Sequence, residues 1–188
     1  MTDSLDFTLY SGGHKGAEAE FGRLAERWGI QEITFSFQGH SIERDRGVRE
    51  LTPEELDKGD VSMEIVSKHM GRSYSKSATI RKVIQSIFHM VNNGYHVIAV
   101  GWIQPDETVK GGTGWAVELA KFFNRPVHVY DQSQNAWFVW ENKTWIPDTT
   151  PVITDKTFVG TGTRNLTDEG RTAITALFEH SFGPAKDK

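Results

Sequence analysis

The chain contains no cysteine, which excludes disulfide bonds, a zinc ribbon and thiol catalysis. Basic residues are not in excess either. The 188 residues carry a formal net charge of −4, whereas proteins that bind nucleic acid usually have a basic surface. Long apolar runs are missing, and residues 1–10 lack a basic segment followed by a hydrophobic one. We therefore expect a cytoplasmic protein with no membrane segment and no nucleic-acid partner.

Stretches rich in β-branched and aromatic residues alternate with stretches whose apolar residues recur at helical spacing. This alternation is typical of an α/β domain with a mostly parallel sheet and helices on both faces. A small hairpin is expected to add an antiparallel pair of strands. The predicted strands are 7–10, 33–37, 95–103, 126–130, 137–140, 144–146 and 158–160, and the predicted helices are 17–28, 61–70, 75–92, 116–123 and one from 167.

A single domain over 1–183 accounts for the length, with a frayed tail at 184–188. Residues 38–72 are polar and charged, and we expect a long loop or helical insertion there, with a short helix that starts at Thr52.

Three glycine-containing turns, at 11–16, 110–114 and 161–164, lead from a predicted strand towards a helix. Loops that leave the carboxyl ends of parallel strands gather at one edge of the sheet, so these turns should converge. Glycine lets backbone N–H groups approach an anion closely, and the start of a helix adds further donors. The turns therefore predict a phosphate site. The alternative is that the glycines only form tight turns.

The side chains around these turns suit a phosphorylated ribose or nucleotide. Asp131 ends a strand and can accept hydrogen bonds from ribose hydroxyls. Glu118 follows Gly114 by four residues and would lie beside a bound phosphate, although an acidic residue there also favours the helix dipole without any chemistry. The residues expected to contact the ligand are Ser11, Gly12, Gly13, Lys15, Gly16, Glu18, Lys110, Gly111, Gly112, Thr113, Gly114, Asp131, Thr161, Gly162, Thr163 and Arg164.

A family resemblance follows from these motifs. Residues 111–114 with Glu118 resemble the Pro-Gly-Gly-x-Gly-Thr-x-x-Glu motif of the lysine decarboxylase-like "LOG" phosphoribohydrolases. Residues 11–18 are similar to the opening of the putative molybdenum-carrier and YspA/YpsA-like families, and residues 158–166 resemble the final strand and turn of that group. As a set they resemble the SLOG superfamily of Rossmann-like nucleotide-ligand proteins over nearly the whole chain.

The resemblance implies a Rossmann-like fold, a pocket for a nucleotide-derived small molecule and, in some members, cleavage of an N-glycosidic bond. Glu118 would then be the catalytic carboxylate. A cation near a helix start would hold the 5′-phosphate, with Arg72, Lys76 and Arg81 as the candidates and Arg72 as our choice. His14 can serve as an acid or base. We expect no cofactor and no metal. We do expect the protein to associate with itself, as many proteins with such folds do.

Two functions of different class remain open. One is a nucleotide N-glycosidase, and the other is a non-catalytic protein that senses or sequesters a nucleotide signal, for instance in conflict between bacteria and phage.

Overall fold

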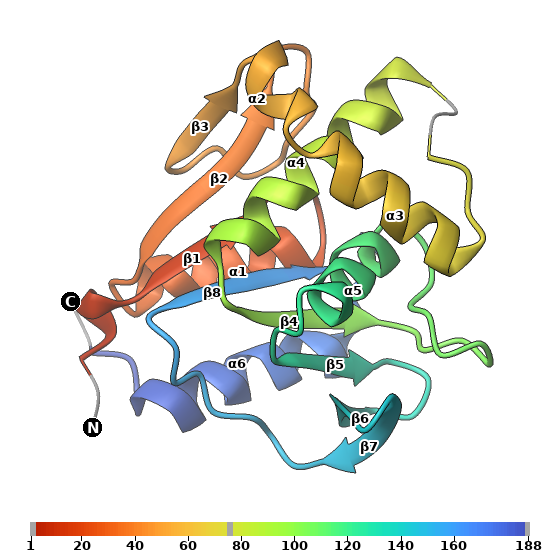
Figure 1. Ribbon diagram of the computed structural model, residues 1–188. Helices are drawn as coiled ribbons and strands as arrows, with labels where there is room; N and C mark the ends of the chain where they lie inside the picture. Colours follow the sequence, from red (N-terminus) through yellow and green to blue (C-terminus); the bar gives the residue numbers. More distant parts are fainter. Residues whose placement is uncertain (1–2, 75–76, 187–188) are drawn as a thin grey trace.

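The computed structural model describes residues 3–74 and 77–186, and its centre is an eight-stranded sheet (Figure 1). The strand order is β3-β2-β1-β8-β4-β5-β6-β7. Neighbours from β3 to β5 are parallel, and β6 and β7 are antiparallel. The predicted parallel sheet and its antiparallel hairpin are therefore confirmed. The strands are β1 (Thr8–Ser11), β2 (Gln31–Phe37), β3 (Val48–Leu51), β4 (His96–Gly101), β5 (Val127–Asp131), β6 (Ala136–Glu141), β7 (Thr144–Asp148) and β8 (Thr157–Gly162).

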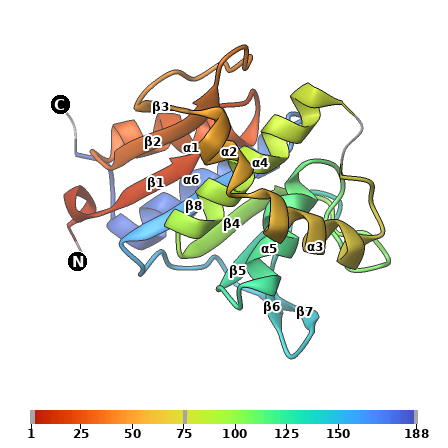
Figure 2. The same ribbon diagram turned by 45° about the horizontal axis from the view of Figure 1, so that its top comes forward.

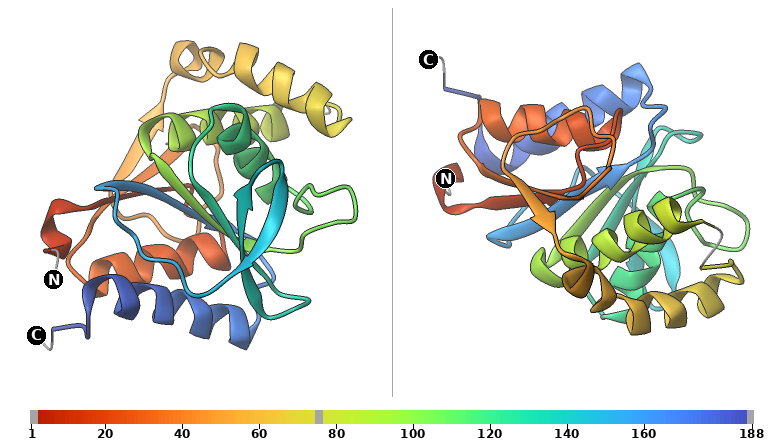
Figure 3. Two further views of the ribbon diagram at one scale, coloured as in Figure 1. Left: turned by 60° about the horizontal axis from the view of Figure 1, so that its bottom comes forward. Right: turned by 90° about the horizontal axis from the view of Figure 1, so that it is seen from above.

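Helices cover both faces of this sheet, which gives a three-layer Rossmann-like fold. Figure 3 shows α1 and α6 on one face and α3, α4 and α5 on the other, and Figure 2 shows α4 lying across the middle strands. None of the described helices combines the length and the apolar content that crossing a lipid bilayer requires. The helices are α1 (Ala17–Arg27), α2 (Pro53–Asp57), α3 (Asp60–Met70), α4 (Ala78–Asn93), α5 (Thr113–Phe122) and α6 (Asp168–Phe182), and a short 3-10 helix, η1, spans Ser4–Asp6.

Strand β4 separates two hydrophobic cores. Val97 belongs to the core under α3, α4 and α5, and its neighbour Ile98 belongs to the core under α1 and α6. Successive strand residues point to opposite faces, so a strand buried on both faces must be apolar throughout. The near-continuous apolar run of β4 is the sequence signal of that position.

The main difference from the sequence prediction is β3. Val48–Leu51 was expected in a loop but pairs in parallel with β2 at the edge of the sheet. Three of its four residues are exposed, so no apolar alternation marks it as a strand. The helix start at Thr52 is confirmed by a complete capping box with Glu55.

Helix α4 begins at Ala78, with Ser77 as its N-cap, rather than at 75. Residues 75 and 76, including the candidate phosphate ligand Lys76, lie outside the described residues.

The tryptophans of the hairpin pack around a lysine of α5. The Lys121 ammonium lies 3.8 Å from the ring centroid of Trp140 and 5.1 Å from that of Trp145. Burial lowers the pKa of Lys121, while the nearby Glu118 carboxylate acts to raise it. This cation–π contact attaches the hairpin to the helix layer and occupies the faces of both rings.

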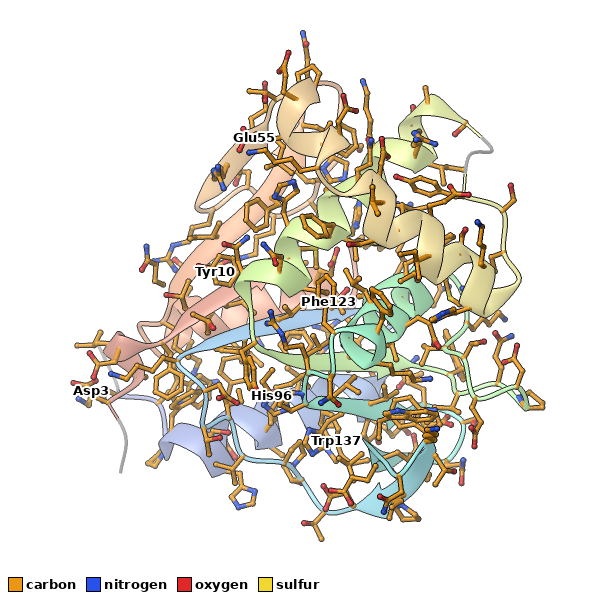
Figure 4. The ribbon with its side chains drawn as sticks, in the orientation of Figure 1. Asp3, Tyr10, Glu55, His96, Phe123 and Trp137 are labelled. Atoms are coloured by element: carbon orange, nitrogen blue, oxygen red, sulfur yellow. The ribbon has the colours of Figure 1, made fainter. Side chains whose placement is uncertain are left out.

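A histidine pair, with His96 buried and His128 half-buried, joins β4, β5 and β7 at the far end of β4 from its glycine loop. His96, labelled in Figure 4, stands at the start of β4, and its Nε2 lies 2.7 Å from Nδ1 of His128. His128 Nε2 lies 3.3 Å from the Asp148 carboxylate. Burial and, to a smaller extent, the neighbouring His128 together lower the pKa of His96 to about 3.

This depressed pKa predicts loss of stability in mild acid. The ordinary value is 6.5, so between about pH 6.5 and 3 the unfolded chain binds a proton that the folded protein excludes. The free energy of unfolding should fall as the pH drops through that window, by up to about 1.4 kcal/mol per pH unit from this one residue. His96→Phe should lose less stability than the wild type between about pH 6.5 and 4, as measured by urea unfolding.

The control lies within the same experiment. Above about pH 7 histidine is neutral in both folded and unfolded chains, so the two stability curves should run parallel there. Parallel curves throughout the acid range as well would show that His96 does not contribute to the acid sensitivity.

Candidate functional site

The candidate site is a cleft at the carboxyl edge of the sheet, where the order of the strands reverses. The chain passes from β1 to β2 on one side and from β4 to β5 on the other, with β8 between β1 and β4. The loops that follow β1, β4 and β8 open into a cavity of about 450 Å³, a volume typical of small-molecule sites. Its lining residues are Gly12, His14, Glu18, Val83, Ser86, Ile87, Met90, Trp102, Lys110, Gly111, Gly112, Thr113, Thr161, Gly162, Thr163, Arg164 and Asn165.

The three glycine turns do converge, as their positions after parallel strands predicted. Most of the expected ligand residues line the cleft. Ser11, Gly13, Lys15, Gly16, Gly114 and Asp131 do not. Ser11, for example, is buried and donates its hydroxyl to the Gly160 carbonyl at 2.8 Å.

One wall of the cleft comes from α4, which the sequence did not single out. Val83, Ile87 and Met90 give it an apolar surface, and Trp102 adds an aromatic ring. Val83 and Ile87 recur at ordinary helical spacing, which is typical of the covered face of any helix. Periodicity shows which face of a helix is covered, but not whether protein or a ligand covers it.

The glycines of the converging loops have different roles. Gly13 has φ 74° and Gly16 has φ 93°, and a Cβ on either would overlap the backbone of a neighbouring loop. A Cβ on Gly162 would overlap the Val100 carbonyl. These three glycines permit close packing. Gly111 and Gly112 differ, because a Cβ on either would meet open space.

The open glycines stand at the start of α5 and beside a cation. Gly112 is the N-cap of α5, and the exposed Lys110 lies 5.7 Å from the Trp102 ring centroid. Arg164, also exposed, borders the cleft from the loop after β8. A helix start with free backbone donors and nearby cations favours an anion.

Glu18 is the buried carboxylate of the cleft. Only 4% of the residue is exposed, yet it lines the cavity. Its Oε1 accepts hydrogen bonds from the backbone N–H of His14 at 3.3 Å and from His14 Nδ1 at 2.8 Å. Its Oε2 accepts one from the Thr161 hydroxyl at 2.9 Å. Gly12 makes room for it, since a Cβ there would lie 2.9 Å from Oε1.

Two further groups extend from His14 away from the carboxylate. His14 Nε2 lies 2.7 Å from Nε2 of His40, and His40 Nδ1 lies 3.0 Å from the hydroxyl of Ser36. Burial lowers the pKa of His40 to about 4, and His14 and Arg164 act in the same direction. His40 is therefore neutral at physiological pH. Its contact with His14 had no sequence signal, because the two histidines are 26 positions apart.

Glu118, the expected catalytic carboxylate, lies elsewhere. It does not line the cleft, and its Oε2 accepts a hydrogen bond from Lys121 at 3.2 Å beside the hairpin tryptophans. The reason is the helical rotation. Thr113 lines the cleft, and five residues further along α5 the side chain points towards the hairpin. The acidic residue of the cleft is Glu18, from the first glycine loop.

Arg72 and Asp131 also have structural roles in place of the predicted ones. Arg72 donates to the carbonyls of Gly111 at 2.8 Å and Val109 at 2.9 Å, so it holds the glycine loop from behind. Asp131 is fully buried and accepts hydrogen bonds from the N–H and hydroxyl of Ser133, which fixes the turn after β5.

The remaining predicted cations lie outside the cleft. Arg81 donates to Asp60 at 3.0 Å and covers the Tyr74 ring. Lys15 borders a neighbouring groove of about 660 Å³, together with arginines that pair with the buried Glu20 and Glu32.

The chain matches no protein-family model, and the comparisons with curated proteins and with solved structures likewise give no match. Support for a function therefore comes from the residues of the cleft.

The contrast between open and packed glycines gives a stability prediction. Gly112→Ala should leave the free energy of unfolding within about 0.5 kcal/mol of the wild type, because its φ is −60° and the new methyl group meets open space. Gly114→Ala should cost more than about 2 kcal/mol, because its Cβ would overlap the Val109 carbonyl and approach Arg72. Urea unfolding of both variants measures the difference, and equal losses would contradict these roles.

Proposed function

We propose that the cleft binds a phosphorylated nucleoside or a related nucleotide derivative, and that it hydrolyses the N-glycosidic bond of that ligand. The observation that carries the proposal is the convergence on one cavity of open glycines, cations, an apolar wall and a buried carboxylate. The open glycines and the cations suit the phosphate of a nucleotide, the apolar wall suits its base, and the carboxylate suits its sugar.

The phosphate fits at the start of α5. Gly111 and Gly112 leave space for it, and the first backbone N–H groups of the helix point towards that space. Lys110 and Arg164 supply positive charge from two different loops. Neither cation has a salt-bridge partner among the described residues, so both are available to an anion.

The base fits against Val83, Ile87 and Met90, which leaves the sugar next to Glu18. In hydrolysis the oxygen of a water molecule bonds to the anomeric carbon while the bond from that carbon to the base nitrogen breaks. The Glu18 carboxylate stabilises the positive charge that develops on the sugar and accepts the proton of the water. That proton passes to the departing nitrogen and restores the carboxylate, so hydrogen and charge balance.

The resemblance of the glycine motifs to the SLOG superfamily supports a nucleotide-derived ligand, with one change of residue. The carboxylate that assists cleavage is assigned to Glu18 in place of Glu118.

The alternative is a sensor or sequestering protein, and a feature of Glu18 favours it. Both carboxylate oxygens already accept hydrogen bonds from protein groups, which leaves little capacity for a water molecule. A binding protein needs only the enclosing cleft.

Glu18→Gln separates these alternatives. If the cleft is a glycosidase, the variant should lose turnover by about 100-fold or more while ligand binding changes little, because the amide cannot accept a proton. The assay uses nucleoside monophosphates, cyclic nucleotides and ADP-ribose derivatives, with released base read by mass spectrometry and binding read by thermal shift.

Glu118→Gln is the matched control, since the same change is made outside the cleft on a residue that pairs with Lys121. Its turnover should equal that of the wild type. A loss in Glu118→Gln with none in Glu18→Gln would contradict the assignment. Binding without release of base by the wild type would favour the sensor.

Gly112→Asp tests the phosphate position separately. The open space at Gly112 accepts the side chain, but its negative charge would stand where the phosphate binds, so affinity should fall by at least about 10-fold. Gly112→Asn is the control, because it has nearly the same shape and no charge. Equal affinity of both variants and the wild type would exclude a phosphate from the start of α5.

A further inference from the structure

A continuous hydrogen-bonded chain leads from the cleft into the sheet. It runs from the Glu18 carboxylate through His14 and His40 to the hydroxyl of Ser36, with contacts of 2.8, 2.7 and 3.0 Å. Its members come from the first glycine loop, from α1, and from β2 and the turn that follows it. The groups that face it are Thr161 at Glu18, the ring of Phe37 stacked on His40 at 4.3 Å, and the charge of Arg164 near His40.

The donors and acceptors can be assigned along the whole chain. An ionised carboxylate only accepts, so His14 Nδ1 carries a proton and donates it to Glu18. In neutral His14 the other nitrogen, Nε2, is then an acceptor, and His40 Nε2 must be the donor that faces it. Neutral His40 then has an unprotonated Nδ1, which accepts from the Ser36 hydroxyl. Every donor therefore points towards Glu18.

Protonation of His14 reverses the outer half of this chain without breaking a contact. Charged His14 donates from both nitrogens, so His40 Nε2 must become an acceptor. His40 stays neutral by carrying its proton on Nδ1, which now donates to the Ser36 oxygen. The net change is that His14 takes up one proton from solvent and the proton of neutral His40 moves from Nε2 to Nδ1, so protons and charge balance.

We propose that Ser36 and His40 are positioning residues of this site, which hold neutral His14 as the Nδ1–H tautomer against Glu18 and reverse their hydrogen bonds when His14 is charged. The part of this inference that concerns turnover depends on the proposed hydrolysis. The part that concerns the tautomers does not. In both states His14 donates its Nδ1–H to Glu18, and in the charged state it also places a positive charge beside that carboxylate.

The burial of both ends of this hydrogen-bonded chain distinguishes it from a chance contact of surface histidines. Ser36 and Glu18 are 5% and 4% exposed, and the stacking on Phe37 restricts the ring of His40. The pair formed by His96 and His128 has the same 2.7 Å separation but ends at Asp148 and not at a cleft.

The test is a two-dimensional ¹⁵N NMR titration of the histidine rings in the full chain without ligand, from about pH 8 to about pH 5, where histidines titrate. At the upper end we expect His14 as Nδ1–H and His40 as Nε2–H. When His14 gains its second proton, His40 should change to Nδ1–H while remaining neutral. A His40 that is Nδ1–H at high pH, or that takes the proton before His14, would overturn the inference.

Ser36→Ala tests the outer end of the chain by removing one hydroxyl from a folded strand. The variant should populate both His40 tautomers at high pH, and the pH profile of its turnover should shift relative to the wild type. His40→Phe keeps the ring on Phe37 and should lower turnover by about 10-fold or more. If it does not fold, the spectra of Ser36→Ala decide alone: an unchanged His40 tautomer in that variant would overturn the role of Ser36.

The two proposals fail in different ways. Spectra that show the predicted reversal in a protein that cleaves no ligand would support the chain and contradict the hydrolysis. Cleavage that depends on Glu18, in a protein whose His40 tautomer never changes, would contradict only the chain.

Discussion

The close fit of β8 between β1 and β4 is the constraint on which the rest of the structure depends. Gly160 leaves room for the ring of Phe21, and Gly162 lies against the backbone of Val100, so a side chain at either position would separate the layers. Strand β8 lies at the centre of the sheet. From β1 the chain continues to β2 on one side of β8, and from β4 it continues to β5 on the other side. The loops after β1, β4 and β8 are brought together at that point, and the cleft exists because they meet there.

The same meeting point concentrates buried polar groups, which a protein tolerates only when each is satisfied. Glu18 is satisfied by His14 and by Thr161 of β8, so one carboxylate joins the first loop to the central strand. Every buried side-chain nitrogen or oxygen of the described residues has a hydrogen-bond partner. The site is therefore preorganised, and little of the free energy of ligand binding is lost in ordering its side chains.

Much of the fold could be predicted from the sequence because its signals are local. The apolar run of β4, the helical spacing in α1 and α4 and the capping box of α2 all act within a few residues. The edge strand β3 could not be predicted, because its four residues are mostly exposed and its pairing with β2 is not encoded in its own pattern.

The sequence predicted which loops form the cleft, but it did not predict which of their side chains face it. The convergence of the glycine turns follows from strand polarity alone. The choice between Glu18 and Glu118 depends on the rotation of each helix relative to the sheet, and the role of Arg72 depends on its contact with Gly111, 39 positions away. The pairing of His14 with His40 likewise requires the turn after β2 to fold back over the first loop, which no short motif records.

A crystal structure with a bound nucleoside monophosphate is the decisive measurement, because it locates every part of the ligand at once. We expect the phosphate within hydrogen-bond distance of the backbone N–H groups at Gly111 and Gly112, the base against α4 and the sugar beside Glu18. A phosphate held instead in the arginine-lined groove beside Lys15, or a cleft that stays empty at saturating ligand, would contradict it.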